Sequence, residues 1–299
     1  MKKVLTIAGS DCSGGAGIQA DLKTIAAHKM YGMSAITALT AQNTTGVSGI
    51  LQSTPEFLAS QLDCIFTDIF PDAVKIGMVG SVPLIRVIAQ KLREYAPKSV
   101  VVDPVMVSTS GSKLLEEDAA GALCSELLPL ATLLTPNLSE AEALSGLRIQ
   151  SAEDMIAAAR KISEIYPSAI LVKGGHSGGS ADDLLFAGGE CHWFSSPRIP
   201  TENTHGTGCT LSSAIACNLA AGASLPEAVR RGKDYVTGAL MDGMDLGHGN
   251  GPLNHCYAMQ PGLPWLEVSP TLSEYASFVD QKDWHSQSYA SSFFAACKH

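Results

Sequence analysis

The feature that most constrains the fold is an alternation of short apolar runs with longer amphipathic segments. The runs are rich in β-branched residues and continuously apolar, which is typical of parallel strands covered on both faces. Strands that alternate with helices in this way predict a parallel α/β sheet. The predicted strands span residues 4–8, 34–39, 73–77, 99–103, 132–135 and 169–173, and the predicted helices between them span 18–29, 55–69, 82–95, 116–128 and 152–166.

The pattern changes after the last of these strands. Apolar segments at 184–187 and 191–194 flank Gly188-Gly189, which predicts a β-hairpin. Two further helices are predicted over 209–221 and 225–241. The predicted fold class is therefore α/β, with a mostly parallel central sheet and a late antiparallel hairpin at its edge.

The 299 residues are expected to form one large domain and an extension. No long linker, charged run or low-complexity tract interrupts the chain before about residue 255. Beyond that point the periodicity fades and prolines become frequent, so we assign residues 1–258 to the domain and 259–299 to a C-terminal extension of unknown role. The conspicuous residues of the extension are Trp265, Trp284, Phe293 and Phe294.

Charge and cysteine content exclude several classes of function. Lysine and arginine number 20 against 29 acidic residues, which gives a net charge of −9. Such a charge repels phosphate backbones and anionic lipids, so we expect neither nucleic-acid nor membrane binding. The eight cysteines are scattered without a C-x-x-C motif, which indicates reduced thiols and a cytoplasmic protein. The apolar stretch after Lys3 is too short for a signal peptide.

A glycine-rich segment, residues 9–20, follows the first predicted strand, where α/β folds bind ligands. Gly15-x-Gly17-x-x-Ala20 matches a dinucleotide fingerprint only formally, because the second predicted strand ends without an acidic residue for the ribose. No Lys-Ser/Thr pair follows the glycines, which excludes a P-loop. We expect a backbone cradle for a small ligand, with a purely structural turn as the alternative. Asp21 is either part of this site or a solvated first-turn acid favoured by the helix dipole.

A second glycine-rich segment, residues 203–210, leads into a helix of small residues. Glycines at a helix start leave backbone N–H groups free to converge on an anion, and the helix dipole adds to the attraction. This predicts a phosphate-stabilising site, with a structural cap as the alternative. Cys209 lies where a lowered thiol pKa is expected, unless it is a small buried filler. The single histidines beside glycines, His176 and His205, are expected to be structural, with a role in catalysis as the alternative.

Eight segments, in order, resemble the hydroxymethylpyrimidine and phosphomethylpyrimidine kinases of the ribokinase-like superfamily. The resemblance does not extend beyond about residue 260. The matching segments are AGSDxSGGAGIQADLKT at 8–24, TALTAQNT at 37–44, KIGMV at 75–79, VDPVM at 102–106 with STSG at 108–111, TPNLSEA at 135–141, VKGGH at 172–176, THGTGCTLS at 204–212 and GHGxGP at 247–252.

The resemblance implies a three-layer α/β/α fold and a kinase of thiamine biosynthesis. Such an enzyme transfers the ATP γ-phosphoryl group to 4-amino-5-hydroxymethyl-2-methylpyrimidine and then to its monophosphate, which yields the pyrophosphate. The implied cofactors are ATP and Mg²⁺, the implied partners are small-molecule substrates, and the implied assembly is a homodimer.

The resemblance also implies roles for residues at the phosphate end of the site. Glu140, at N-x-x-E spacing, would hold Mg²⁺ through water, because Mg²⁺ takes few protein ligands; otherwise it is an N-terminal helix acid. Lys173 would meet a phosphate or form an interior ion pair with Asp103, and both can hold. The implied catalytic residues are Gly206, Thr207, Gly208, Cys209 and Lys173, and the implied ATP-binding residues are Asp103, Asn137, Lys173 and Thr207.

Cys209 stands where many sugar kinases of the superfamily carry an aspartate base. We expect it to be the base or a close partner of the attacking hydroxyl, with positioning and electrostatics alone as the alternative. For the pyrimidine, the Gln42 amide offers a donor and an acceptor together, which matches an amino group beside a ring nitrogen. Met78 would line the ring. The full set of expected substrate-binding residues is Gln42, Asp21, Gly9, Ala16, Met78 and Val105.

Three alternatives remain at the level of sequence. Related enzymes with the Gly-Thr-Gly-Cys pattern phosphorylate pyridines as well as pyrimidines, so a pyridoxal (vitamin B6) kinase is the second candidate, although Gln42 favours the pyrimidine. A non-catalytic ligand-binding protein could retain the fold. An interaction module in the extension is a third possibility.

Overall fold

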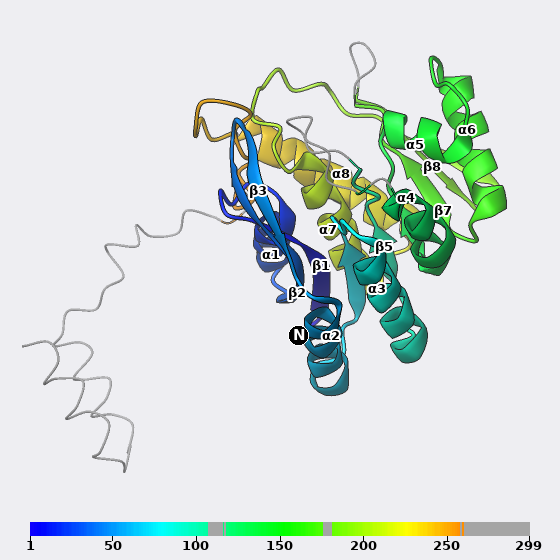
Figure 1. Ribbon diagram of the computed structural model, residues 1–299. Helices are drawn as coiled ribbons and strands as arrows, with labels where there is room; N and C mark the ends of the chain where they lie inside the picture. The colour runs from blue at the N-terminus through cyan, green and yellow to red at the C-terminus, as the bar shows by residue number, and fades with distance from the viewer. Residues whose placement is uncertain (107–115, 117, 176–180, 258, 260–299) are drawn as a thin grey trace, which may run out of the picture. The chain divides into compact units, whose positions relative to one another are not determined.

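The computed structural model describes residues 1–106, 116, 118–175, 181–257 and 259 (Figure 1). The chain divides into two compact units, Met1–Ala258 and Met259–His299, and the helices and strands of the described residues belong to the first. The STSG segment at 108–111, His176 and the aromatic residues of the extension lie outside the described residues.

Within the described residues, nine strands form one sheet in the order β3-β2-β1-β4-β5-β6-β7-β8-β9. Six neighbouring strands are parallel to one another: β2, β1, β4, β5, β6 and β7. Strands β3, β8 and β9 pair antiparallel, so the predicted mostly parallel sheet and its late hairpin are confirmed. The strands are β1 (Lys3–Asp11), β2 (Tyr31–Asn43), β3 (Gly46–Gln52), β4 (Ala73–Ile76), β5 (Val100–Val102), β6 (Leu133–Leu134), β7 (Ala169–Val172), β8 (Asp183–Ala187) and β9 (Glu190–Phe194).

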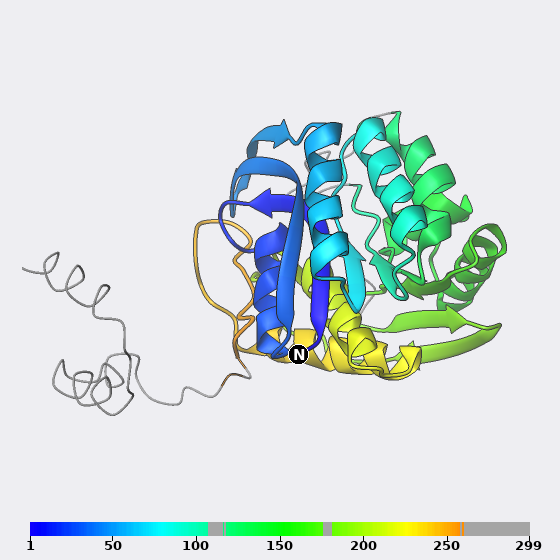
Figure 2. The same cartoon turned by 90° about the horizontal axis from the view of Figure 1, so that it is seen from below.

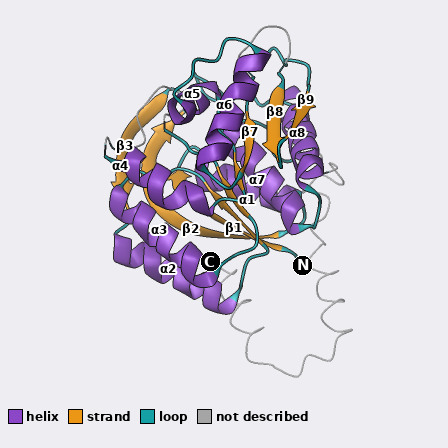
Figure 3. Ribbon diagram, turned by 90° about the vertical axis from the view of Figure 1, so that its right-hand side faces the viewer, coloured by secondary structure: helices purple, strands orange, loops and turns teal. Residues whose placement is uncertain are grey.

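Helices cover both faces of the sheet (Figures 2 and 3). One apolar core lies between the sheet and helices α2, α3, α4, α5 and α6, and a second lies between the sheet and α1, α7 and α8. The architecture is therefore the expected three-layer α/β/α fold. The helices are α1 (Gly17–Ala27), α2 (Pro55–Asp68), α3 (Val82–Tyr95), α4 (Ala119–Ala122), α5 (Leu138–Ser145), α6 (Ala152–Ile165), α7 (Thr207–Ala220) and α8 (Leu225–Met241).

Local sequence signals explain several of these bounds. Thr54 accepts a hydrogen bond from the Phe57 backbone N–H at 3.2 Å, and Pro55 occupies the first turn of α2, where no N–H is needed. Ser151 and Asp154 form a capping box at the start of α6. In the centre of the sheet, β1 buries consecutive residues on both faces, as its continuous hydrophobicity predicts.

The prediction of one continuous α-helix over 116–128 is wrong. The segment contains α4, a π-helical turn over Leu123–Leu127 and a 3-10 turn over Leu128–Leu130. The Arg93 guanidinium donates to the Glu126 carbonyl oxygen at 3.0 Å, which satisfies a carbonyl near the end of this segment. Two elements are absent from the prediction: β3, whose residues are mostly exposed, and the short helix α5.

In the part of the chain that the structure describes, the helices are too short or too polar to cross a membrane. The described cysteines are all free, and they range from the buried Cys217 to the exposed Cys64.

Candidate active site

The candidate site lies where β1, β2, β5 and β7 end and where α7 begins. The two predicted glycine-rich segments meet there through their backbones. Gly206 has φ of +89°, and a Cβ atom at this position would overlap the carbonyl oxygen of Gly15. A Cβ on Gly15 would in turn collide with the ring of His205. Both positions require glycine because the two segments pack backbone against backbone.

The start of α7 presents an anion-binding arrangement. Gly206 is the N-cap residue in a left-handed conformation, and helix geometry leaves the N–H groups of Gly208 and Cys209 without an intrahelical acceptor. A Cβ on Gly208 would lie 3.2 Å from Asp103 Oδ2 and 3.4 Å from Lys173 Nζ, so the helix start directly adjoins a cation. Backbone donors, the helix dipole and an ammonium group therefore converge on one location.

Lys173 forms the interior ion pair that its position predicts. Its Nζ atom lies 2.7 Å from Asp103 Oδ1, and the Thr135 hydroxyl donates to the same oxygen at 3.1 Å. Burial by itself would lower the pKa of Lys173, but the charges of Asp103 and Glu140 outweigh it and raise the pKa. The lysine side chain is 16% exposed, so a positive charge is kept at the edge of the site.

Asn137 and Glu140 form a capping box at the start of α5. The Asn137 backbone N–H donates to Glu140 Oε2 at 2.8 Å, and the Glu140 N–H donates to Asn137 Oδ1 at 2.9 Å. Glu140 is thus an acid in the first turn of a helix, as the alternative interpretation expected, and this position does not by itself exclude a role in binding Mg²⁺. Burial raises the pKa of Glu140 to about 7, with Lys173 opposing this and Asp103 adding to it. The carboxylates of Asp103 and Glu140 therefore lie near each other and near Lys173.

This donor set fits a weakly held Mg²⁺ ion. The described residues contain no group of three or more His, Cys, Asp or Glu side chains that could enclose a metal. Mg²⁺ needs no such cage, because it keeps several waters and is bound by one or two carboxylates together with substrate phosphates. The raised pKa of Glu140 indicates a carboxylate that lacks cationic neighbours sufficient to offset its burial.

The expected lowering of the Cys209 thiol pKa is wrong for the free protein. Burial raises the pKa, and the charges of Asp21 and Asp103 act in the same direction. Lys75 and the backbone N–H of Gly17 oppose the shift without reversing it. The helix start alone is therefore not enough to ionise this thiol.

Asp21 does not occupy the position expected of a substrate-binding or solvated acid. It is completely buried, and each of its carboxylate oxygens accepts from Lys75 Nζ at 2.8 Å. Thr6 and Ser213 also donate to it, at 2.6 and 2.7 Å. Asp21 lacks the exposed surface that a direct substrate contact requires. It holds Lys75, whose Nζ lies 2.8 Å from where a Cβ of Gly77 would be.

Sequence reasoning missed Lys75, although a signal was present. The strand β4 reads Ala-Val-Lys-Ile and all four residues are buried, so a lysine in its interior requires a buried acidic partner.

The residues expected to bind the pyrimidine lie around the ends of β1 and β2. A Cβ on Gly9 would lie 3.0 Å from the Met78 sulfur, so these two residues are in contact. Gln42 is half-buried near the end of β2, and its side chain lies 3.3 Å from the His205 ring. Ala16 donates its N–H to Asp11 at 2.9 Å, and Asp11 contacts the same ring. These contacts bring Gly9, Ala16, Met78 and Gln42 into one neighbourhood, and Val105 is half-buried just after β5.

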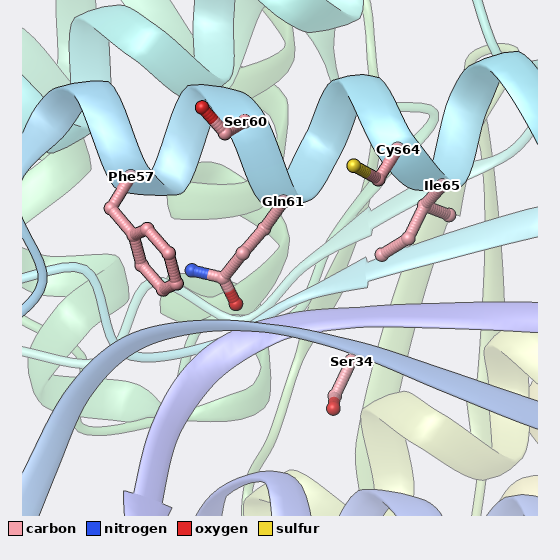
Figure 4. Close-up of a pocket in the computed structure, with 6 residues that line it drawn as sticks. All are labelled: Ser34, Phe57, Ser60, Gln61, Cys64 and Ile65. Carbon is pink, nitrogen blue, oxygen red and sulfur yellow. The ribbon is translucent and has the colours of Figure 1, made fainter.

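A surface depression away from these residues is a separate feature. It measures about 330 Å³ and lies between α2 and β2 (Figure 4). The Gln61 amide that lines it is already bonded to the Ile36 backbone, as acceptor at 2.9 Å and as donor at 3.3 Å. The depression contains no charged side chain and carries no feature of a phosphate site. Its lining residues are Ser34, Phe57, Ser60, Gln61, Cys64 and Ile65.

The chain is similar in sequence to a known family of kinases. A model of the phosphomethylpyrimidine kinase family matches residues 11–254. The thiamine biosynthesis bifunctional protein of Geobacter sulfurreducens is 52% identical over 258 residues, which are 86% of this chain and 53% of that protein. The chain thus spans about half the length of that relative. The hydroxymethylpyrimidine/phosphomethylpyrimidine kinase of Streptomyces coelicolor is 48% identical over 86% of this chain and 95% of that protein.

A solved structure shares the fold as well. The ADP complex of Bacillus subtilis pyridoxal kinase has a TM-score of 0.81 and 39% sequence identity, and the match covers 87% of this chain and 99% of that one. The family match includes the glycine-rich start of α7, the Lys173–Asp103 pair and most of the Gln42 neighbourhood. On this evidence the chain belongs to the phosphomethylpyrimidine kinase family.

Proposed function

We propose that the protein is the ATP-dependent hydroxymethylpyrimidine and phosphomethylpyrimidine kinase of a thiamine biosynthesis pathway. One observation carries this proposal: the anion-binding start of α7 packs directly on the glycine-rich segment beside Gln42, through Gly206 and Gly15. A phosphoryl group held at Gly208 and Cys209 would thus lie near a hydroxymethyl group on a ring held at Gln42. Phosphoryl transfer requires this juxtaposition more than it requires covalent help from the protein.

Backbone and side-chain groups would take different roles in the phosphoryl transfer. The N–H groups of Gly208 and Cys209, together with Lys173, are aimed at the negative charge that develops on the transferred group. Asn137 and Asp103 would lie on the nucleotide side, and Thr207, the first residue of α7, would lie between the two substrates. Mg²⁺, held through water by Glu140, would neutralise charge on the nucleotide phosphates when bound.

Cys209 would stay protonated in the free enzyme, because burial raises its pKa. The transition state of phosphoryl transfer is loose, so the attacking hydroxyl needs to lose its proton only late in the reaction. We propose that Cys209 lies against this hydroxyl and receives its proton as the thiolate, which forms when the thiol first gives its own proton to water with Lys75 supplying nearby positive charge.

The proposed activity is tested by incubating the protein with the aminopyrimidine alcohol, ATP and Mg²⁺ and resolving both phosphorylated products by chromatography. We expect the monophosphate to appear first and the pyrophosphate second. Cys209→Ala should lower kcat about 100-fold with ATP binding intact. His192→Leu, at a partly exposed position of the edge strand β9 outside the candidate site, is the matched control and should change neither quantity. Nearly full turnover by Cys209→Ala would exclude the proton-accepting role.

Pyridoxal kinase activity is the second candidate, favoured by the similarity to a solved pyridoxal kinase. A parallel measurement of kcat/KM for the aminopyrimidine and for pyridoxal decides between them, and the amide of Gln42 favours the pyrimidine. If neither compound is phosphorylated, the protein is a ligand-binding relative of these kinases.

We further propose that the enzyme acts in the cytoplasm as a homodimer without nucleic-acid partners. Free cysteines among the described residues support the cytoplasmic location, and the net charge of −9 argues against nucleic-acid partners; the dimer rests on the family resemblance. Light scattering on the full chain tests the dimer.

A further inference from the structure

His205 contacts several separate segments around the candidate site. It is 7% exposed, and its backbone N–H donates to the Gly251 carbonyl at 3.0 Å. Gly15 packs against one edge of its ring. Ring atom Nε2 lies 2.8 Å from Asp11 Oδ2 and 3.3 Å from the Gln42 amide nitrogen. The ring is therefore held in place. Whether Nε2 donates a hydrogen bond to the Gln42 amide or accepts one from it depends on whether Nε2 carries a hydrogen.

Asp11 determines where that hydrogen lies. Hydrogen bonds from His205, Ser13 and Ala16 outweigh the effect of burial and lower the pKa of Asp11 to about 2, so the group is an ionised carboxylate at neutral pH. A carboxylate only accepts hydrogen bonds. An unprotonated Nε2 at 2.8 Å would set two acceptors against each other, so Nε2 must carry a hydrogen and donate it to Asp11. A ring nitrogen that donates has no lone pair to accept from Gln42.

Thr40 imposes a second constraint on Gln42. The Thr40 hydroxyl has one hydrogen and lies near two oxygen atoms, the Ser10 carbonyl at 3.0 Å and the Gln42 side-chain oxygen at 3.1 Å. Both oxygens can only accept, but the backbone carbonyl is fixed whereas the amide can turn, so the hydroxyl donates to Ser10 and offers its own lone pairs to Gln42. A 180° turn of the amide about its last torsion places its NH₂ group toward Thr40 and its oxygen toward His205. The NH₂ group then donates to Thr40, and the one hydrogen on Nε2 is shared between Asp11 and the amide oxygen.

We propose that His205 is a specificity-determining positioning residue, which fixes the orientation of the Gln42 amide through an Nε2–H group that Asp11 holds in place. In this orientation one amide hydrogen and one lone pair of the amide oxygen remain free side by side. That pair complements a heteroaromatic ring with an amino group next to a ring nitrogen, as in an aminopyrimidine. A pyridine such as pyridoxal lacks this adjacent pair. The inference deepens the proposed function and rests on it.

Two measurements test the proposal. In the wild-type protein, long-range ¹⁵N–¹H correlation spectra of the histidine rings should show a hydrogen on Nε2 of His205, with the signal assigned by its loss in His205→Gln. In kinetics and calorimetry, His205→Leu should raise both KM and Kd for the aminopyrimidine about tenfold, the effect of losing one hydrogen bond. KM for ATP should change less than twofold. His205→Gln, whose amide nitrogen can replace Nε2–H, should recover most of the affinity.

The preference for the aminopyrimidine over pyridoxal should fall in His205→Leu and return in His205→Gln, while His192→Leu leaves it unchanged. An Nε2 without hydrogen would overturn the proposal, and this result can be obtained even if the leucine variant does not fold. Equal increases in KM for ATP and for the pyrimidine, without recovery in His205→Gln, would show that His205 only packs the loops. Failure of the wild-type protein to phosphorylate the pyrimidine would refute the proposed function separately, because binding and the spectra do not require turnover.

Discussion

Replacing Lys75 with methionine would remove one half of an ion pair that has no contact with solvent. Lys75 and Asp21 are both 0% exposed, and Nζ lies 2.8 Å from each carboxylate oxygen. Burial by itself would lower the pKa of Lys75, but the charge and hydrogen bonds of Asp21, together with nearby Cys209 and Asp103, outweigh it and raise the pKa. The lysine is therefore charged at neutral pH, and the variant leaves the Asp21 carboxylate buried without a counter-charge.

The expected loss follows from what remains around Asp21. Removing one partner of a buried ion pair costs about 3–5 kcal/mol. Thr6 and Ser213 still donate to the carboxylate in the variant, so we expect the lower end, about 3 kcal/mol. For a domain of this size, 1 kcal/mol corresponds to roughly 2–4 °C, so Tm should fall by about 6–12 °C.

Urea unfolding at pH 7 and scanning calorimetry measure this loss. The double variant Lys75→Met with Asp21→Asn removes the uncompensated charge and should be more stable than Lys75→Met alone. Lys2→Met is the matched control, because its ion pair with Asp72 is exposed and should contribute less than about 1 kcal/mol. The reasoning is refuted if Lys75→Met unfolds within 1 kcal/mol of wild type, or if Asp21→Asn adds to the loss.

Three further outcomes are expected. Gly206→Ala places a Cβ against the Gly15 carbonyl at a φ of +89°, so it should lower both kcat and Tm; unchanged kinetics would contradict the packing of the two loops. Burial raises the pKa of Glu140 to about 7 from 4.5, so the folded state keeps a proton that the unfolded chain has lost. The stability of the nucleotide-free protein should therefore fall as pH rises from about 4.5 to about 7, and urea midpoints of Glu140→Gln should lack this slope. Truncation after residue 258 should leave Tm within about 2 °C of wild type, whereas truncation after residue 252 removes the buried Leu253 and His255 and should lower Tm clearly.

The parallel sheet could be predicted from the sequence because its signals are local. Apolar runs of β-branched residues mark β1, β4 and β7, and the predicted bounds of α3 and α8 agree with the structure. The strand β3 gave no such signal, since it is an edge strand whose residues are mostly exposed. The glycines and small residues at the start of α7 likewise indicated a phosphate site, because free N–H groups at a helix start need only local geometry.

The tertiary structure alone decided the partners of the polar residues. Asp21 meets Lys75 from 54 positions away, and Asp11 meets His205 from 194 positions away. No periodicity encodes such pairs, since they arise only when strand ends and helix starts converge at one edge of the sheet. The pKa of Cys209 shows the same limit: its sequence context favours ionisation, but burial and two neighbouring carboxylates outweigh Lys75 and raise the pKa. The chain by itself thus determined its layers and the place of its site, and packing determined the charge states within it, because burial and long-range contacts set the cost of each charge.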